Sequence, residues 1–180
     1  GTVRREWIKK LGITTVHIDP YLNNTAAFVG GRWIAPKPGT DTAMALAIAN
    51  VWFTEGTYDK EYVAKRTYGI EKWEEYVMGK TDGVPKTPEW QEPITGVPAR
   101  VVRALAQEWG RKKTYLACGG IHSFGSACRT AYGTEWARAM VCLVAMQGLG
   151  KPGVNFGGLQ FGTPLDTHFY FPGYAEGGLS

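Results

Sequence analysis

Cysteine is scarce in this sequence. The 180 residues contain three cysteines, Cys118, Cys128 and Cys142, and no two of them form a Cys-x-x-Cys pair. Because such pairs supply the thiolates of many zinc sites and iron–sulfur clusters, this sequence by itself builds neither kind of site. The odd number of thiols favours a reducing compartment, and we expect a cytoplasmic protein.

Long apolar runs and a strong net charge are also lacking. The longest apolar run, Met140 to Met146, is far shorter than the ~20 residues that a membrane-spanning helix needs. The net charge is only +4, and the basic cluster Arg111-Lys112-Lys113 follows a helix pattern, where cations favour the helix C-terminus. Since no basic face is interleaved with aromatic residues, we expect neither a membrane span nor a nucleic-acid partner.

Two glycine-rich stretches do not match the common nucleotide motifs. Gly119-Gly120 and Gly125 lack the spacing of a G-x-G-x-x-G dinucleotide loop. Near Gly148, Ala145 stands where a P-loop needs its first glycine, and Pro152 stands where it needs Ser or Thr. These departures disfavour a nicotinamide dehydrogenase and a P-loop ATPase.

The composition that remains is typical of one globular domain. Hydrophobic residues make up 44% of the chain and charged residues 20%, and a chain of this length can bury a core. The chain begins at Gly1 without an initiator Met or a leader, and it ends on a Gly-rich stretch. We therefore expect both ends to be internal points of a longer chain.

Strand and helix patterns alternate along the chain. Ile13–Ile18 and Thr114–Cys118 are expected to be buried strands, and Arg32–Ala35 a short one. Six helices are expected: one that ends at Lys10, and others over Thr42–Phe53, Asp59–Arg66, Glu71–Met78, Val97–Trp109 and Glu135–Gln147. The helix Thr42–Phe53 has Thr40 or Asp41 as its N-cap and ends at Gly56. Lys80–Pro93 is loop-like, although Thr87-Pro88 resembles a helix start. The alternation predicts an α/β fold with a mainly parallel sheet.

The segments after the strands offer candidate binding residues. In an open α/β sheet, ligands bind beyond the carboxyl ends of the strands. Asp19-Pro20 follows the first strand, Pro38-Gly39-Thr40-Asp41 follows the short one, and Gly119-Gly120 follows the last. A carboxylate such as Asp41 can accept hydrogen bonds from guanine N1 and N2. The alternatives are a strand-ending turn, a helix-capping loop and an ordinary tight turn.

Taken in order, several segments carry a family resemblance. They are Val16–Pro20, Trp33–Asp41 with the Ala-rich helix after it, Glu55–Val63, Ile94–Pro98, the Gly-Gly strand end, and Gln147–Gly153. This series resembles the dimethyl sulfoxide reductase family of molybdopterin enzymes, from about Thr14 to Gly153. The resemblance implies a three-layer Rossmann-like cofactor domain over residues 1–153 and a Gly-rich connecting segment over 154–180, both within a larger multidomain subunit.

The resemblance also implies cofactors and partners. Two molybdopterin guanine dinucleotides and one molybdenum are expected in the holoenzyme, with iron–sulfur clusters elsewhere and a small iron–sulfur subunit as partner. The metal ligand and the cluster cysteines of the family lie upstream of these residues, so we assign no metal ligand here and expect this chain alone to be inactive.

Residue roles follow from the same resemblance. Ile18, Asp19 and Tyr21 would hold the ribose and phosphate. Gly39, Thr40 and Asp41 would meet the guanine. Four residues after the last strand would face the pterin or the funnel that leads to the metal: Gly119, Gly120, His122 and Ser123.

Two segments, Gly119–Trp136 and Phe169–Gly178, depart from the common reductases of the family. Both segments resemble a member of the family that acts on polyhydroxybenzenes, and this resemblance implies transfer of a hydroxyl group, pyrogallol to phloroglucinol, without net redox change. Such a substrate needs flat aromatic walls and hydrogen-bonding groups, which Trp136, Tyr132, His122 and Arg129 could supply. Alternatively, Trp136 anchors the helix in the core as Trp52, Trp73, Trp90 and Trp109 are expected to do, His122 is a turn residue, and Arg129 lies at the surface or pairs with the pyrophosphate.

Two other functions stay open. A reductase of sulfur compounds or arsenic oxyanions from the same family would share the cofactor contacts and differ in the pocket loop. A non-catalytic α/β module would instead wrap its Gly-rich tail around a partner chain, with Tyr170, Phe171 and Tyr174 as interface residues.

Overall fold

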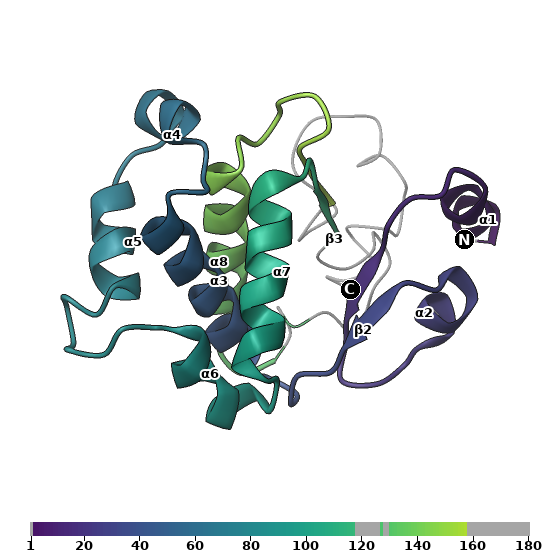
Figure 1. Cartoon of the computed structure of the whole chain (residues 1–180), viewed down its shortest axis with the longest axis horizontal. Coiled ribbons are helices and arrows are strands. Elements are labelled where there is room, and N and C mark those ends of the chain that lie inside the picture. Colours follow the sequence, from purple (N-terminus) through teal and green to yellow (C-terminus); the bar gives the residue numbers. More distant parts are fainter. Residues whose placement is uncertain (1, 118–126, 128–129, 158–180) are drawn as a thin grey trace, which may run out of the picture.

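Eight helices and four short strands make up the part of the chain that the computed structural model describes, residues 2–117, 127 and 130–157. The helices are α1 (Thr2–Lys10), α2 (Asn24–Val29), α3 (Asp41–Glu55), α4 (Lys60–Arg66), α5 (Ile70–Val77), α6 (Pro88–Thr95), α7 (Ala99–Arg111) and α8 (Gly133–Met146). The strands are β1 (Val16–Ile18), β2 (Arg32–Ile34), β3 (Tyr115–Ala117) and β4 (Asn155–Gly157). The strand pair β1–β2 lies to one side of the central helices, with α1 and α2 beyond it (Figure 1).

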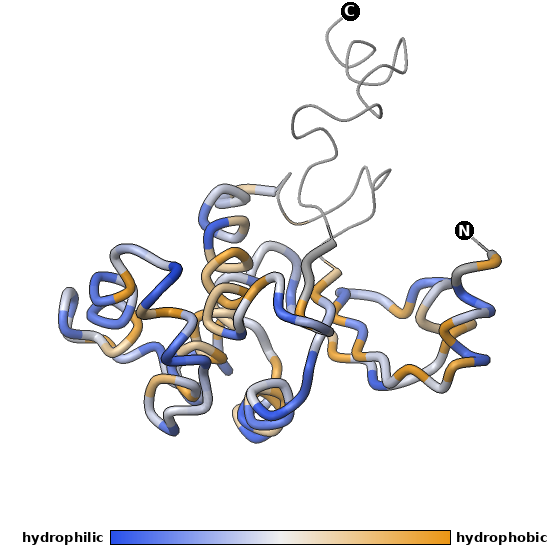
Figure 2. The backbone as a smooth tube through the Cα atoms, turned by 90° about the horizontal axis from the view of Figure 1, so that it is seen from above, coloured by the Kyte–Doolittle hydropathy of each residue, from blue (hydrophilic) through white to orange (hydrophobic). Residues whose placement is uncertain are grey.

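Helix α3 forms the centre of the core. Every residue from Ala43 to Trp52 is buried, because α5, α6, α7 and α8 all contact α3. A helix that is apolar on all sides is stable only when it is covered on all sides. Figure 2 shows hydrophobic stretches along these central helices, while hydrophobic and hydrophilic stretches alternate in the outlying part near the N-terminus.

Tryptophan side chains join α3 to its neighbours. Trp52 of α3 is fully buried and lies edge-on to Trp109 of α7, with ring centroids 5.0 Å apart. Its indole Nε1 donates to the carbonyl of Ala106 at 2.7 Å, so the buried polar atom is satisfied. Trp73 and Trp90 pack against the same core. The expectation that these four residues occupy helix-packing positions is therefore confirmed.

Both strand pairs are parallel, as the alternation predicts. β1 pairs with β2 in the register Val16↔Arg32 to Ile18↔Ile34, and β3 pairs with β4. They form two separate two-stranded sheets among the described residues. A three-layer fold around one mainly parallel sheet therefore stays a prediction. β4 begins at Asn155, beyond the expected domain boundary at Gly153, and it was not expected from the sequence.

The expectation of buried strands is wrong for the described residues. The first strand is shorter than Ile13–Ile18, and the side chains of Ile13 and Ile18 are 53% and 37% exposed. In β3, Tyr115 is 60% exposed. An apolar run becomes a buried strand only when helices cover both faces of its sheet. The exposure of these strand residues shows that neither strand is buried along its whole length in the described part of the chain.

Most helices begin and end where their capping residues predict. Asp59 accepts from the backbone N–H of Tyr62 at 3.0 Å and starts α4, and Gly56 ends α3 in the left-handed conformation. Thr87 accepts from Trp90 N at 3.2 Å ahead of α6. Lys80–Pro93 is therefore only partly a loop, since the helix start at Pro88 continues through Pro93 to Thr95. The short helix α2 was missed, although Asn23 caps it.

A close approach of backbones fixes the β1–β2 pair. Gly31 has a φ of +99°, and a Cβ atom there would lie 2.3 Å from the carbonyl oxygen of Thr15. That carbonyl accepts from Arg32 N at 3.0 Å, and the hydroxyl of Thr15 donates to Gly30 O at 2.8 Å. Only glycine allows the chain to enter β2 at this distance from β1.

A buried hydrogen-bond network holds the corner between α6 and α7. The amide Nε2 of Gln91 donates to the carbonyls of Pro88 (2.9 Å) and Val97 (2.8 Å), and its Oε1 accepts from the hydroxyl of Thr95. The same hydroxyl oxygen accepts from Val97 N at 3.0 Å. Gln91 and Thr95 are fully buried, so each of these polar groups needs its partner.

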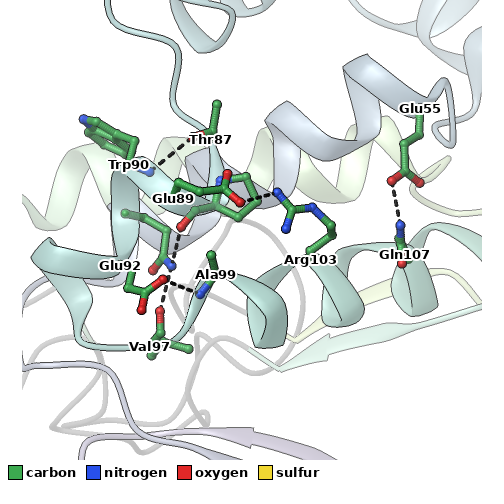
Figure 3. Close-up of polar contacts among 11 residues, drawn as sticks. Glu55, Thr87, Glu89, Trp90, Glu92, Val97, Ala99, Arg103 and Gln107 are labelled. Carbon is green, nitrogen blue, oxygen red and sulfur yellow. Dashed lines mark hydrogen bonds and ion pairs between the residues drawn. The ribbon is translucent and has the colours of Figure 1, made fainter.

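Two carboxylates extend this corner to its surface. Glu92 accepts from the backbone N–H of Ala99 at 2.9 Å, at the start of α7, and Glu89 accepts from Arg103 at 2.6 Å (Figure 3). Farther along α7, Gln107 donates to Glu55 of α3 at 2.7 Å (Figure 3). The α6–α7 corner is thus bound internally and to the central helix.

The described helices contain no segment long and apolar enough to cross a membrane.

Replacing Thr95 with valine tests the buried network. Valine keeps the shape of the side chain but leaves the amide oxygen of Gln91 and the N–H of Val97 without their partner. We expect the free energy of unfolding to fall by about 1–3 kcal/mol, as for buried polar groups left unpaired. Urea unfolding of the variant and of the parent chain measures the difference.

Gln107→Ala is the matched control, since it removes an exposed hydrogen bond from the neighbouring helix. Its cost is expected to stay within about 0.5 kcal/mol. An equal loss of unfolding free energy in Thr95→Val and Gln107→Ala would show that the buried network stabilises the chain no more than an exposed hydrogen bond does.

Candidate functional site

The carboxyl ends of β1 and β2 define the candidate site. Because Ile18 pairs with Ile34 in a parallel register, the residues that follow the two strands emerge at the same edge of the sheet. Asp19 leaves β1 there, and the Pro36–Gly39 loop leaves β2 and leads into Asp41 at the start of α3. The structure thus brings two of the expected cofactor segments together.

Asp19 is fixed by four hydrogen bonds. Its backbone N–H donates to Ile34 O at 3.1 Å, and its carbonyl accepts from Trp33 Nε1 at 2.9 Å. Its carboxylate accepts from Tyr21 N through Oδ1 (3.2 Å) and from Asn23 Nδ2 through Oδ2 (2.9 Å). The side chain is half-buried, so its free acceptor positions can meet a ligand.

The loop after β2 is held by the α6–α7 corner. Lys37 N donates to the carbonyl of Thr95 at 2.8 Å, and Lys37 Nζ donates to the carbonyl of Pro93 at 3.2 Å. The hydroxyl of Thr40 donates to Lys37 O at 2.6 Å. Because Thr95 belongs to the buried network, the position of the loop depends on that network.

Gly39 leaves the backbone of this loop open. It has a φ of +77°, and a Cβ atom at this position would have no neighbour within 4 Å. Space beside an exposed backbone is what a ligand needs for close approach. Thr40 occupies the N-cap position of α3 without a side-chain capping bond, so the helix-capping interpretation of this residue receives no support.

Asp41 carries an unfavourable charge. Burial raises the pKa of its carboxyl group above the ordinary value of 3.8, against a backbone hydrogen bond that lowers it, and the charge of Asp19 raises it further. The N-terminus of α3 favours a carboxylate, but burial and the nearby charge of Asp19 oppose the ionised form of Asp41, which hydrogen bonds donated by a ligand would favour. The pair is therefore suited to a ligand rich in N–H and O–H donors.

This set of groups fits the nucleoside end of the expected cofactor. A guanine base presents two adjacent donors, N1–H and the exocyclic N2 amine, which one carboxylate can accept, and ribose presents hydroxyl donors. Asp41 and Asp19 are acceptors of that kind, and Gly39 leaves room beside them. Among the residues described, no group of three or more His, Cys, Asp or Glu side chains could hold a metal ion.

The other expected site residues divide into three groups. Ile18 and Tyr21, 37% and 67% exposed, flank Asp19 at the same edge. Trp136 is buried in the core cluster with α3, as expected if it anchors the helix in the core. Tyr132, at the start of α8, is exposed and has a φ of 63°. The remaining residues lie outside the described ranges: Gly119, Gly120, His122, Ser123 and Arg129, as do Tyr170, Phe171 and Tyr174.

The described residues also line two shallow depressions. One, of about 330 Å³, lies between β2 and α7 and is lined by Arg32, Trp33 and Arg100. The other, of about 560 Å³, adjoins the C-terminal ends of α3 and α7 and includes Lys113 and Lys151. Neither is lined by Asp19 or Asp41, although the first reaches Ile34, the last residue of β2.

The glycine-rich segment Gln147–Gly153 packs at the end of the domain that holds the second depression. Lys151 forms an ion pair with Asp59, and the amide of Asp59 donates to Met146 O at 2.7 Å. The contact with Lys151 lowers the pKa of Asp59. Within the described residues the segment therefore has a structural role between α4 and α8.

Sequence reasoning missed the residues that hold the site. Asn23, Trp33 and Lys37 all bond to the candidate segments, yet none was proposed as a functional residue. Asn23 could have been found, because Asn before Asn-Thr-Ala-Ala has the pattern of a helix N-cap. Trp33 and Lys37 bond to residues that are distant in the sequence, and no pattern in the neighbouring residues predicts these contacts.

Comparison with known proteins relates the whole chain to molybdenum enzymes. No protein-family model matches the chain. It is 56% identical over 180 residues to the large subunit of pyrogallol hydroxytransferase from Pelobacter acidigallici, covering 100% of this chain and 21% of that protein. It is 37% identical over 181 residues to the dimethyl sulfoxide/trimethylamine N-oxide reductase of Rhodobacter capsulatus, covering 97% of this chain and 21% of that protein.

A solved structure supports the fold. The structure of acetylene hydratase from Pelobacter acetylenicus matches with a TM-score of 0.67 and 24% identity, over 81% of this chain and 18% of that chain. At this identity the likeness concerns the fold alone. The chain spans about a fifth of the length of the curated relatives it matches.

Replacing Asp41 with asparagine should stabilise the chain. A carboxyl group whose pKa is raised in the folded state costs stability when ionised, and this cost disappears as the pH falls below the raised pKa toward the ordinary value. We therefore expect a higher unfolding midpoint for Asp41→Asn at pH 7 and a shrinking difference toward about pH 4. Thermal unfolding across this pH range measures both effects.

Asp82→Asn is a control of opposite sign, because the ion pair with Lys86 lowers the pKa of Asp82. This variant should unfold at a lower temperature at pH 7, with the loss fading in acid. A lower midpoint for Asp41→Asn at pH 7 would contradict the assigned burial of an unfavourable charge.

Proposed function

Because the chain belongs, as a segment, to the molybdopterin oxidoreductase family, we propose that it forms part of the large subunit of a molybdenum enzyme and binds the guanosine end of a molybdopterin guanine dinucleotide. The observation that carries this proposal is the meeting of Asp19 with the Gly39–Asp41 segment at one edge of a parallel strand pair. In the intact subunit, the segment up to Gly153 would belong to a three-layer Rossmann-like domain.

Each residue at the edge has a defined task in this proposal. Asp41 accepts hydrogen bonds from guanine N1 and N2, which offsets the cost of its ionised form. Asp19 accepts from the ribose hydroxyls, with Ile18 and Tyr21 beside the sugar and its phosphate. Gly39 lets the base approach the backbone, and Thr40 adjoins it. Gly119, Gly120, His122 and Ser123 would continue the site toward the pterin.

The proposed reaction is the conversion of pyrogallol to phloroglucinol. Identity to a pyrogallol hydroxytransferase large subunit is 56%, against 37% to a dimethyl sulfoxide/trimethylamine N-oxide reductase, which supports the transhydroxylase over the reductase. The two trihydroxybenzenes are isomers, so a hydroxyl group moves around the ring without net oxidation or reduction. The molybdenum, when bound, supplies the centre that binds and activates the substrate oxygens.

The pocket residues follow as part of this proposal. Tyr132 is exposed ahead of α8 and is free to meet an aromatic ring, and His122 and Arg129 would lie on the same loop. Burial of Trp136 in the core supports a role in anchoring α8 there. We therefore assign Trp136 to the support of the pocket and Tyr132 to its wall.

Partners and location complete the proposal. The relative is named a large subunit, which supports a further subunit in the enzyme, and we propose that it carries iron–sulfur clusters. A cytoplasmic location stays a prediction from the sequence.

Titration with GMP tests the cofactor assignment. We expect the folded chain to bind GMP saturably, and IMP less tightly because IMP lacks the N2 amine. Asp41→Ala should weaken GMP binding by about 1–3 kcal/mol, or about 5- to 150-fold, the cost of a lost hydrogen bond to a charged group. Isothermal calorimetry measures the affinities, and thermal unfolding verifies that each protein is folded.

Glu61→Ala serves as the matched control, since Glu61 is also an acidic residue in the first turn of a helix. It should leave GMP affinity unchanged. The assignment is rejected if the folded chain does not bind GMP, or if Asp41→Ala binds it as tightly as the parent chain.

The requirement for an electron donor distinguishes the transhydroxylase from the reductase. The complete enzyme that contains this chain is expected to convert pyrogallol to phloroglucinol in the absence of any external reductant. A reductase would instead consume dimethyl sulfoxide or arsenate only when an electron donor such as a reduced viologen is supplied. Chromatography of the phenols and the rate of viologen oxidation give the two readouts, and viologen oxidation without phenol conversion would exclude the transhydroxylase.

A further inference from the structure

The side-chain amide of Asn23 has two separate contacts. Its oxygen Oδ1 accepts from the backbone amides of Thr25 and Ala26, both at 2.9 Å, and thereby caps α2. Its nitrogen Nδ2 donates to Oδ2 of Asp19 at 2.9 Å. A serine or aspartate would serve as a cap about equally well, so capping alone does not require an amide here.

The second contact restrains the carboxylate of Asp19. Oδ1 of Asp19 accepts from Tyr21 N at 3.2 Å and Oδ2 accepts from Asn23, so each oxygen is held by one donor. An ionised carboxylate has about four acceptor positions, and two of them stay free for a ligand. Restraint at both oxygens fixes the direction in which those free positions point.

Without this restraint the carboxylate would turn away. The charges of Asp19 and Asp41 repel each other, and the charge of Asp19 is one of the causes that raise the pKa of Asp41. A freely rotating Asp19 side chain would lower this repulsion by moving toward solvent, since the residue is only half-buried. The amide of Asn23 opposes that movement because it offers a donor on the protein side.

We propose that Asn23 is a positioning residue that orients Asp19 toward the ribose hydroxyls of a bound guanosine nucleotide. This inference rests on the proposed function of the edge and assigns to it a determinant of sugar specificity. A carboxylate held in one direction distinguishes a ribose from a 2′-deoxyribose by the hydroxyl it accepts from. A site that is built to bind a hydroxyl rejects the analogue that lacks it.

Substitution of Asn23 with serine separates the two contacts. Serine keeps the cap of α2 and removes only the donor to Asp19, so the unfolding midpoint should stay near that of the parent chain. We expect GMP affinity to fall about tenfold and dGMP affinity to change little, so that the preference for GMP over dGMP is lost. Asn23→Asp, which keeps the cap and places a negative charge against Asp19, should weaken GMP binding further.

Asn24→Ser is the matched control, because Asn24 is the next residue and its side chain is exposed. It should retain both the affinity for GMP and the preference over dGMP. A variant Asn23→Ser that binds both nucleotides like the parent chain would overturn the proposal, as would a general loss of stability that lowers both affinities equally.

A ligand-free measurement distinguishes this inference from the proposed function. When Asp19 is released, its charge moves away from Asp41, so the pKa of Asp41, followed by NMR, should fall slightly in Asn23→Ser, while burial of Asp41 keeps it above the ordinary value. Failure of the parent chain to bind GMP would reject the proposed function while this shift could still be seen. An unchanged pKa of Asp41 would show that Asn23 does not position Asp19.

Discussion

The burial of α3 on all sides is the constraint on which the rest of the structure depends. Its apolar residues from Ala43 to Trp52 are covered by four helices, which leaves the direction of the helix little freedom. The first residue of this rigid element is Asp41, and its position is therefore set by the packing of the core. The same core holds the α6–α7 corner, which in turn holds the loop before Asp41 through Lys37. A site at the surface thus inherits its geometry from contacts deep in the protein.

The helices could be predicted from the sequence to within a few residues, because their caps are local. Asp59, Thr87 and Gly56 act on neighbouring amides and carbonyls, and the structure has them in those roles. The burial of the strands could not be predicted, since it depends on which helices cover the sheet. Ile13 and Ile18 have the composition of a covered strand and are exposed among the described residues.

The candidate site was predictable in part for the same reason. Asp19 and Asp41 each follow a strand, and the rule that ligands bind at carboxyl ends placed them together before their contacts were known. The supporting residues were not predictable, because Trp33 and Lys37 reach the site by hydrogen bonds whose partners are distant in the sequence or on the other strand. Trp136 could not be assigned from the sequence, since an aromatic residue on a helix satisfies a pocket and a core equally well.

The contact of Gly31 with Thr15 has a consequence for how this sequence can change over evolutionary time. Any side chain at position 31 would occupy the space of the Thr15 carbonyl and push β1 away from β2. Since Asp19 ends one strand and the loop to Asp41 ends the other, such a substitution would separate the two carboxylates without touching either. Substitutions at position 31 are therefore expected to be selected against, although this residue lies at the opposite end of the strands from the candidate site.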